Sequence, residues 1–131
     1  MIEVGADLPE KVFYLDRDLL KRYADASGDQ NPIHQNEEFA VSVGLPNVIA
    51  HGMLTMALVG KYVSDLAGGS AKVVEFGARF TKPVIVPAVE KVDLTVTATV
   101  AEIAEGKISL TLSATSAGVK VLGMAKAVVL Q

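Results

Sequence analysis

The stretch "GMLTMALVGKYVSDLAGG", residues 52–69, decides the fold class. Apolar side chains surround this predicted helix on nearly every side, which is typical of a helix buried in a core. The closing pair of glycines suits a helix end, so we expect the helix to span residues 52–67. Lys61 and Asp65 interrupt the apolar run, and the stretch therefore does not predict a membrane span.

Gly60 lies in the middle of this helix, where glycine costs about 1 kcal/mol relative to alanine. Something must therefore need the space that its missing side chain leaves. A closely packed neighbouring strand is one explanation, and a bound ligand chain is the other. The sequence leaves both open.

From residue 73 onward, apolar and polar residues alternate as they do in half-buried strands. Glu105 and Gly106 between two of these runs indicate a hairpin turn. A buried helix followed by antiparallel strands predicts an α+β fold, in which a curved sheet wraps around the helix. The expected strands lie in "VVEFGARF" (73–80), "VDLTVTATV" (92–100), "ISLTLSAT" (108–115) and "KVLGMAKAVVL" (120–130), and we expect Val74, Phe76, Ala78 and Phe80 to share one face of the first.

Two shorter helices are predicted before the buried one. The segment "DRDLLKRYADASG" has Asp16 as an N-terminal cap and Gly28 as a left-handed stop. Its expected apolar stripe is Leu19, Tyr23 and Ala26. The segment "NEEFAVSVG" (36–44) begins with an asparagine cap and carries acidic residues in its first turn.

The composition predicts one globular domain over residues 1–131, since half of the residues are apolar. The net charge is −3 and no basic stripe is present, which argues against a nucleic acid or an anionic membrane as partner. The chain has no cysteine, and this excludes disulfides and thiolate chemistry. Its first residues lack the pattern of a secretory signal, so we expect a cytoplasmic protein.

The segment "GDQNPIH" (28–34) holds the first candidate catalytic residues. Asp29 follows a helix end and His34 follows a proline, so both backbones are restrained. Such a pair could share one water molecule and act as general acid and base, which contributes about 10²–10⁴ in rate. Asn31 could orient the water or a partner side chain. Alternatively, Asp29 and Asn31 only form turn hydrogen bonds, and His34 is a loop histidine without a catalytic role.

The segment "AHGML" (50–54) begins the buried helix, where the first backbone N–H groups have no partner within the helix. Gly52 would let a substrate oxygen approach such an N–H, as in an oxyanion hole. The alternative is that His51 caps the helix and Gly52 relieves crowding; we interpret His51 itself as structural. Two histidines without cysteine do not form a recognisable metal site, and no phosphate or dinucleotide loop is present, so neither a metal nor a cofactor is expected.

The run "YADASGDQNPIHQNEEFA" together with "GLPNVIAHGML" and "RFTKPV" resembles the MaoC-like (R)-specific enoyl-thioester hydratases and dehydratases. The resemblance spans nearly the whole chain. It is strongest to the catalytic B-type subunits of actinobacterial (3R)-hydroxyacyl-acyl-carrier-protein dehydratases. It implies a single hotdog fold, with a long central helix wrapped by an antiparallel sheet. It also implies reversible hydration of trans-2-enoyl thioesters in fatty-acid elongation or degradation, with an acyl-CoA or acyl-carrier-protein substrate.

The resemblance implies a role for each motif residue. Asp29 and His34 match the catalytic pair, Gly52 the amide that binds the thioester carbonyl, and Asn31 the asparagine behind the pair. Some short-chain hydratases carry a serine where this chain has Gly60, so any contribution from that hydroxyl is lost here.

Hotdog domains usually pair edge to edge, and we therefore expect a homodimer or a heterodimer with a related subunit. Two other hotdog classes remain as alternatives. Acyl-CoA thioesterases usually draw a carboxylate from the central helix, which here offers only Asp65. Non-catalytic partner subunits tend to lack the pair that Asp29 and His34 form.

Overall fold

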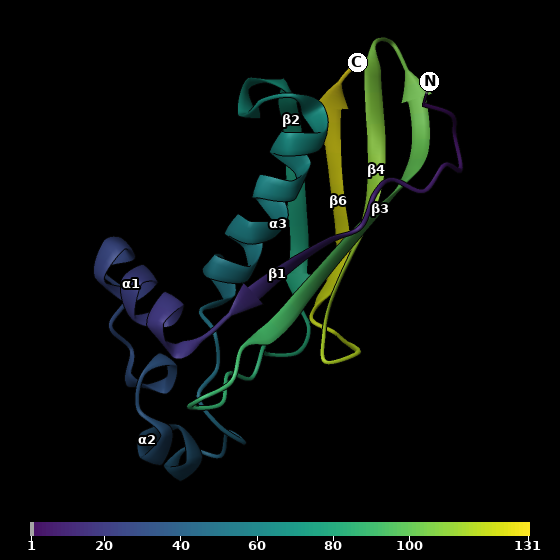
Figure 1. The fold of residues 1–131 in the computed structure, drawn as a ribbon. Coiled ribbons are helices and arrows are strands. Elements are labelled where there is room, and N and C mark those ends of the chain that lie inside the picture. The colour runs from purple at the N-terminus through teal and green to yellow at the C-terminus, as the bar shows by residue number, and fades with distance from the viewer. Residues whose placement is uncertain (1) are drawn as a thin grey trace.

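The computed structural model describes residues 2–131 and shows one curved antiparallel sheet with a long helix packed against it (Figure 1). The strands follow the order β1 (Lys11–Leu15), β3 (Val92–Ala104), β4 (Lys107–Ser116), β6 (Leu122–Leu130) and β2 (Val73–Phe80), and β5 (Val119–Lys120) pairs with β4. The helices are α1 (Arg17–Ser27), α2 (Glu37–Ser42) and α3 (Gly52–Ala67), with 3₁₀ turns at Pro32–His34 and Ser70–Lys72. This is the predicted α+β hotdog fold.

The core forms between α3 and the sheet. Alternating residues of β3 and β4 supply its sheet side, as the period of two predicted. The hairpin between these strands turns at Glu105 and Gly106, both with positive φ, as a two-residue type I′ turn requires. The fully or almost fully buried members are Leu94, Val96, Ala98 and Val100 in β3 and Ile108, Leu110, Leu112 and Ala114 in β4.

The predicted bounds of α3 are confirmed, but its burial on all sides is not. Val59 and Val63 are completely buried, whereas Met53 is 61% exposed and Ala57 is also exposed. A helix that lies on one face of a sheet buries only the side toward that sheet. Its outer side therefore stays open in the single chain.

Two further expectations about packing are corrected. Register shifts in the pairing of β2 with β6, between Val73 and Glu75 and between Gly77 and Arg79, break the alternation of β2. As a result Val73 packs against the core, while Val74 is 46% exposed. In α1 the buried residues are Leu20 and Ala24. Ala26, which was expected to belong to the apolar stripe, is exposed.

The first strand, β1, was not predicted from the sequence. It pairs with β3 in antiparallel register, from Lys11 opposite Val96 to Leu15 opposite Val92. The strand leads directly into α1, whose cap Asp16 accepts a hydrogen bond from the Leu19 N–H at 2.8 Å. Because β1 at the edge of the sheet runs directly into α1, its pairing with β3 fixes the position of α1 and of the loop that follows. Among residues 2–131 no helix is both long and apolar enough to cross a membrane.

Candidate active site

The loop between α1 and α2 carries Asp29 and His34 and is fastened to the segment before α3. Gly28 ends α1 in the left-handed conformation, with φ of 84°, and turns the chain toward α3. The Ile49 N–H donates to the Ile33 carbonyl at 3.2 Å. The Ala50 N–H donates to the Val84 carbonyl and the Val86 N–H to the Val48 carbonyl, which forms a short antiparallel bridge. The two predicted site segments therefore lie side by side.

A hydrogen bond to the backbone holds His34 in one orientation and determines which ring nitrogen carries the proton when the ring is neutral. Its Nδ1 lies 2.7 Å from the Ile49 carbonyl oxygen, which only accepts hydrogen bonds, so Nδ1 carries the proton. The Nε2 of the neutral ring is then an acceptor. The side chain is 7% exposed and forms part of a pocket wall. Only the edge of the ring that carries Nε2 is then available to a substrate.

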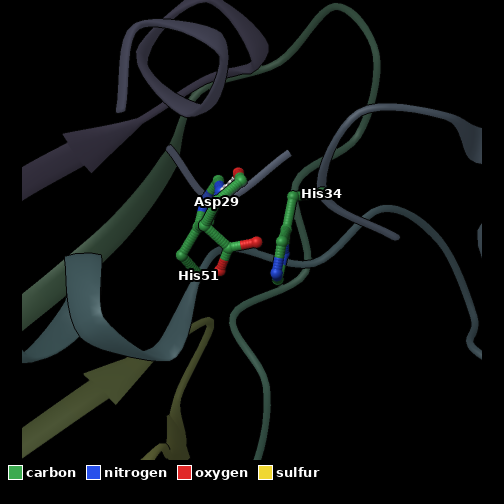
Figure 2. A group of neighbouring side chains, drawn as sticks. All are labelled: Asp29, His34 and His51. Carbon is green, nitrogen blue, oxygen red and sulfur yellow. Dashed lines mark hydrogen bonds between the residues drawn. The ribbon is translucent and has the colours of Figure 1, made fainter. Parts of the chain in front are cut away.

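Asp29 and His34 come together as predicted, and His51 joins them (Figure 2). A carboxylate oxygen of Asp29 and one nitrogen of each histidine lie within 4.8 Å of one another. Two hydrogen bonds of about 2.8 Å each can span such a gap through a single oxygen atom. The spacing of Asp29 and His34 therefore suits a bridging water.

The stacking of the two histidines bears on whether this cluster suits a metal ion. The rings of His34 and His51 lie 3.8 Å apart between centroids with 23° between their planes. Lone pairs of stacked rings point side by side instead of converging on one point. One nitrogen of each ring also already faces a backbone carbonyl. The geometry fits a hydrogen-bonded acid–base unit better than a tetrahedral metal site.

Gly52 is the first residue of α3 and lines the same pocket as His34. Its N–H belongs to the first helical turn, where the helix supplies no acceptor and its dipole is positive. A Cβ at this position would stand 3.1 Å from the ring of Phe80, which forms part of the pocket wall. Glycine therefore avoids a crowded contact with the ring of Phe80 at this position.

The pocket itself is mostly apolar and has a volume of about 280 Å³. Thr55, one turn into α3, and Lys82, after β2, add polar groups to its wall. The remaining lining residues are Ile49, Ala50, Phe80, Thr81, Pro83, Val84 and Val121. A mostly apolar wall with a few polar groups suits an apolar chain that carries a polar head.

The turn hydrogen bonds considered as an alternative are also present. The Asp29 Oδ1 accepts from the Asn31 N–H at 3.1 Å, and the Asn31 Oδ1 accepts from the Ile33 N–H at 3.1 Å. Asn31 therefore caps the short turn Pro32–His34. Its side chain acts on His34 through the backbone of this turn, because its oxygen accepts from a backbone N–H and not from a side chain.

The alternative that the His51 side chain caps α3 is wrong. His51 occupies the N-cap position of α3, yet its side chain does not cap the helix. Its Nε2 lies 3.1 Å from the Asp29 carbonyl oxygen instead, and the side chain is only 1% exposed. Burial is the main cause that lowers the pKa of His51, and it outweighs the opposing effect of the hydrogen bond to the Asp29 carbonyl. The only sequence signal for this contact was that each of the two site segments contains one of the two histidines of the chain.

Comparison with known proteins agrees with the observed fold. A family model described as "MaoC like domain" matches residues 6–118. The chain belongs to the MaoC-like domain family. This MaoC-like domain is 44% identical over 69 residues to 3-hydroxyacyl-thioester dehydratase X of Mycobacterium tuberculosis. The aligned segment covers 53% of this chain and 24% of that relative.

Two solved structures match almost all of the MaoC-like domain. A protein described as a MaoC-like dehydratase is 36% identical with a TM-score of 0.95, over 98% of this chain and 40% of the other. The R-hydratase PhaJ1 from Pseudomonas aeruginosa is 27% identical with a TM-score of 0.83, over 98% of this chain and 81% of that one. The chain spans only about a quarter of the curated relative, so that relative contains much more than this domain.

Proposed function

We propose that this MaoC-like domain adds water reversibly to trans-2-enoyl thioesters, giving (3R)-hydroxyacyl thioesters, with Asp29 and His34 as its acid–base pair. One observation carries the proposal. An Asp29 carboxylate oxygen and a ring nitrogen of His34 lie within 4.8 Å of each other, which one water can bridge, and His34 lines an apolar pocket together with Gly52. The likeness to an R-hydratase over nearly the whole chain supports it.

The protonation state of the pair determines how it holds water. An ionised Asp29 carboxylate and the Nε2 of neutral His34 both accept hydrogen bonds. A water between them donates one hydrogen to each, and its oxygen lone pairs are then directed away from the protein, toward C3 of the substrate. The two groups act as a coupled unit, so base and acid are not divided between them.

In hydration, an O–H bond of this water breaks and a C3–O bond forms, with the proton passing to the pair. The C2–C3 π electrons shift toward the thioester carbonyl, whose oxygen gains negative charge. The Gly52 N–H stabilises that oxygen; one such donor is worth about 10²–10³ in rate. A proton from the pair then forms the new C2–H bond. Dehydration follows the same steps in reverse.

The surroundings of the pair suit an acyl thioester on a phosphate-bearing carrier. The apolar wall accepts the acyl chain, and Lys82, an exposed cation on the pocket wall, lies where it could contact a phosphate of coenzyme A or of an acyl-carrier protein. The thioesterase alternative needs a carboxylate from α3. Asp65 is exposed near the far end of that helix and pairs with Lys61 at 3.0 Å, which supports the hydratase assignment.

We also propose that the domain acts as a homodimer or a heterodimer with a related subunit. The strand β2 is an edge of the sheet and therefore has one unpaired side, which invites pairing with another chain. Large apolar side chains are exposed along it and beside it, namely Val74 and Phe80 in β2 and Met53 in α3. Phe80 also borders the pocket, so pairing along this edge would place the partner next to the site.

A hydration assay tests the activity. The purified protein is mixed with crotonyl-CoA and with a longer 2-enoyl-CoA, alone and with a candidate partner subunit, and the loss of enoyl-thioester absorbance is followed. Chiral analysis of the product is expected to give the (3R) isomer. Release of free thiol without water addition would instead identify a thioesterase, and the (3S) isomer would contradict the proposed stereochemistry.

A further inference from the structure

His51 lies at the point where the acid–base loop meets the N-terminus of α3. Its ring stacks on that of His34 with 3.8 Å between centroids and meets the Tyr23 ring edge to face with 4.8 Å between centroids. Its Nε2 faces the Asp29 carbonyl oxygen (Figure 2). One buried side chain thus contacts both members of the proposed pair, and the next residue along the chain is Gly52.

The partners of the ring determine its tautomer. Nε2 must carry the proton, because the Asp29 carbonyl only accepts. Nδ1 is then an acceptor, and within residues 2–131 it is buried without a hydrogen-bond partner. Burial lowers the pKa of His51, so the ring stays neutral near pH 7. A neutral ring places no repelling charge on His34 when His34 takes up a proton.

Packing alone does not explain a histidine here. A phenyl ring of similar size would keep the contacts with Tyr23 and His34 without burying a nitrogen that lacks a partner. What a phenyl ring cannot supply is the hydrogen bond from Nε2 to Asp29.

That hydrogen bond matters because the other hydrogen bonds of Asp29 within residues 2–131 are local. The Asp29 N–H donates to Ser27 Oγ at the end of α1 at 3.2 Å, and its carboxylate accepts from the Asn31 N–H in its own loop. Neither contact reaches α3. The bond to His51 spans 22 residues and connects Asp29 to the start of α3.

We propose that His51 is a positioning residue, which sets the distance between the acid–base pair and the carbonyl-binding amide of Gly52. Its Nε2–H fixes the Asp29 backbone, its ring face supports His34, and its own peptide bond leads into Gly52. The inference rests on the proposed hydratase function and adds a third residue to it. A displacement of about 1 Å between reacting groups can lower a rate by about 10²-fold.

Two substitutions separate positioning from packing. His51→Gln retains an N–H donor at about the place of Nε2 but loses the flat ring. His51→Phe retains the ring and loses the donor. Tyr62→Phe is the matched control, because it removes another buried side-chain donor to a backbone carbonyl, that of Pro9 at 2.8 Å, toward the distal part of α3. All variants are compared at equal folded fraction, measured by urea unfolding.

Positioning predicts that His51→Phe lowers kcat by about 10- to 100-fold while KM changes by less than about threefold. His51→Gln should retain kcat within about fivefold of the parent protein, and Tyr62→Phe should leave it unchanged. Loop amide resonances from Asp29 to His34 should shift and broaden in His51→Phe but not in His51→Gln.

The reverse order of activity, with the phenylalanine variant above the glutamine variant, would overturn the inference and show that the ring serves packing. That result leaves the hydratase function intact, because the parent protein is active in the same assay. An inactive parent protein would instead overturn the proposed function, and the positioning role with it.

Discussion

The ring of Phe76 in β2 lies over Gly60 of α3, so close that a Cβ at Gly60 would stand 3.2 Å from Cε2 of the ring. Phe80 of the same strand lies over Gly52 in the same way. The two glycines are eight residues apart in the helix, a rise of about 12 Å, and the two phenylalanines are four residues apart in the strand, a span of about 13 Å. The spacing of the rings therefore equals the spacing of the glycines. The neighbouring strand, and not a ligand chain, therefore accounts for the space at Gly60.

Replacing Gly60 by alanine tests this packing. Alanine gains about 1 kcal/mol in helix propensity, but crowding against a packed ring costs about 1–3 kcal/mol. We expect Gly60→Ala to lower the free energy of unfolding by about 1 kcal/mol. In a Phe76→Leu background, which lacks the crowded ring atom, the same change should be stabilising. Urea unfolding of the four proteins measures both effects, and an equal effect in the two backgrounds would refute the close contact.

Removing the acceptor of Asn31 should weaken the turn that carries His34. Asn31→Ala removes a cap of the kind that is worth about 1 kcal/mol, and we expect about a tenfold lower kcat because His34 loses its fixed approach to the water. Asn31→Ser keeps a side-chain oxygen that can accept from the Ile33 N–H and should restore most of the activity. Equal activity of both variants would show that this side chain does not orient the pair.

The lowered pKa of His51 predicts a pH dependence of stability. Below the ordinary value of 6.5 the unfolded chain binds a proton at this residue that the folded protein, with its lowered pKa, does not bind. The free energy of unfolding therefore falls as the pH falls below 6.5, by at most about 1.4 kcal/mol per pH unit from this group. Above 6.5 both states are neutral at His51 and its contribution is constant.

His51→Gln removes this contribution, since glutamine does not titrate. Urea unfolding between about pH 5 and pH 8 should give a shallower acid decline for the variant than for the parent protein. Parallel curves for the two proteins would show that His51 titrates alike in the folded and unfolded states.

Much of the architecture follows from local pattern. The caps Asp16 and Asn36, the glycines after α1 and α3, and the hairpin at Glu105 and Gly106 were all predictable, because each satisfies a backbone requirement within a few residues. The inward faces of β3 and β4 were predictable because a period of two persists over their central residues.

What escaped prediction depends on distant contacts. The strand β1 is only five residues long and exists because β3 pairs with it. The face of β2 changes where its pairing with β6 shifts register. The contact of His51 with Asp29 joins residues 22 positions apart, and no local pattern indicates which carbonyl a buried imidazole will reach.

The central claim is that Asp29 takes part in proton transfer, and one comparison of two carboxylates tests it most directly. Asp29→Asn keeps the size of the side chain but removes its charge and basicity, whereas Asp25→Asn makes the same change to an exposed carboxylate of α1 that pairs with Lys21 and Gln30. We predict that Asp29→Asn lowers kcat/KM for enoyl-thioester hydration by about 10²–10⁴-fold with the fold intact, and that Asp25→Asn leaves it unchanged. Retention of full activity by Asp29→Asn, or an equal loss in both variants, would contradict the account.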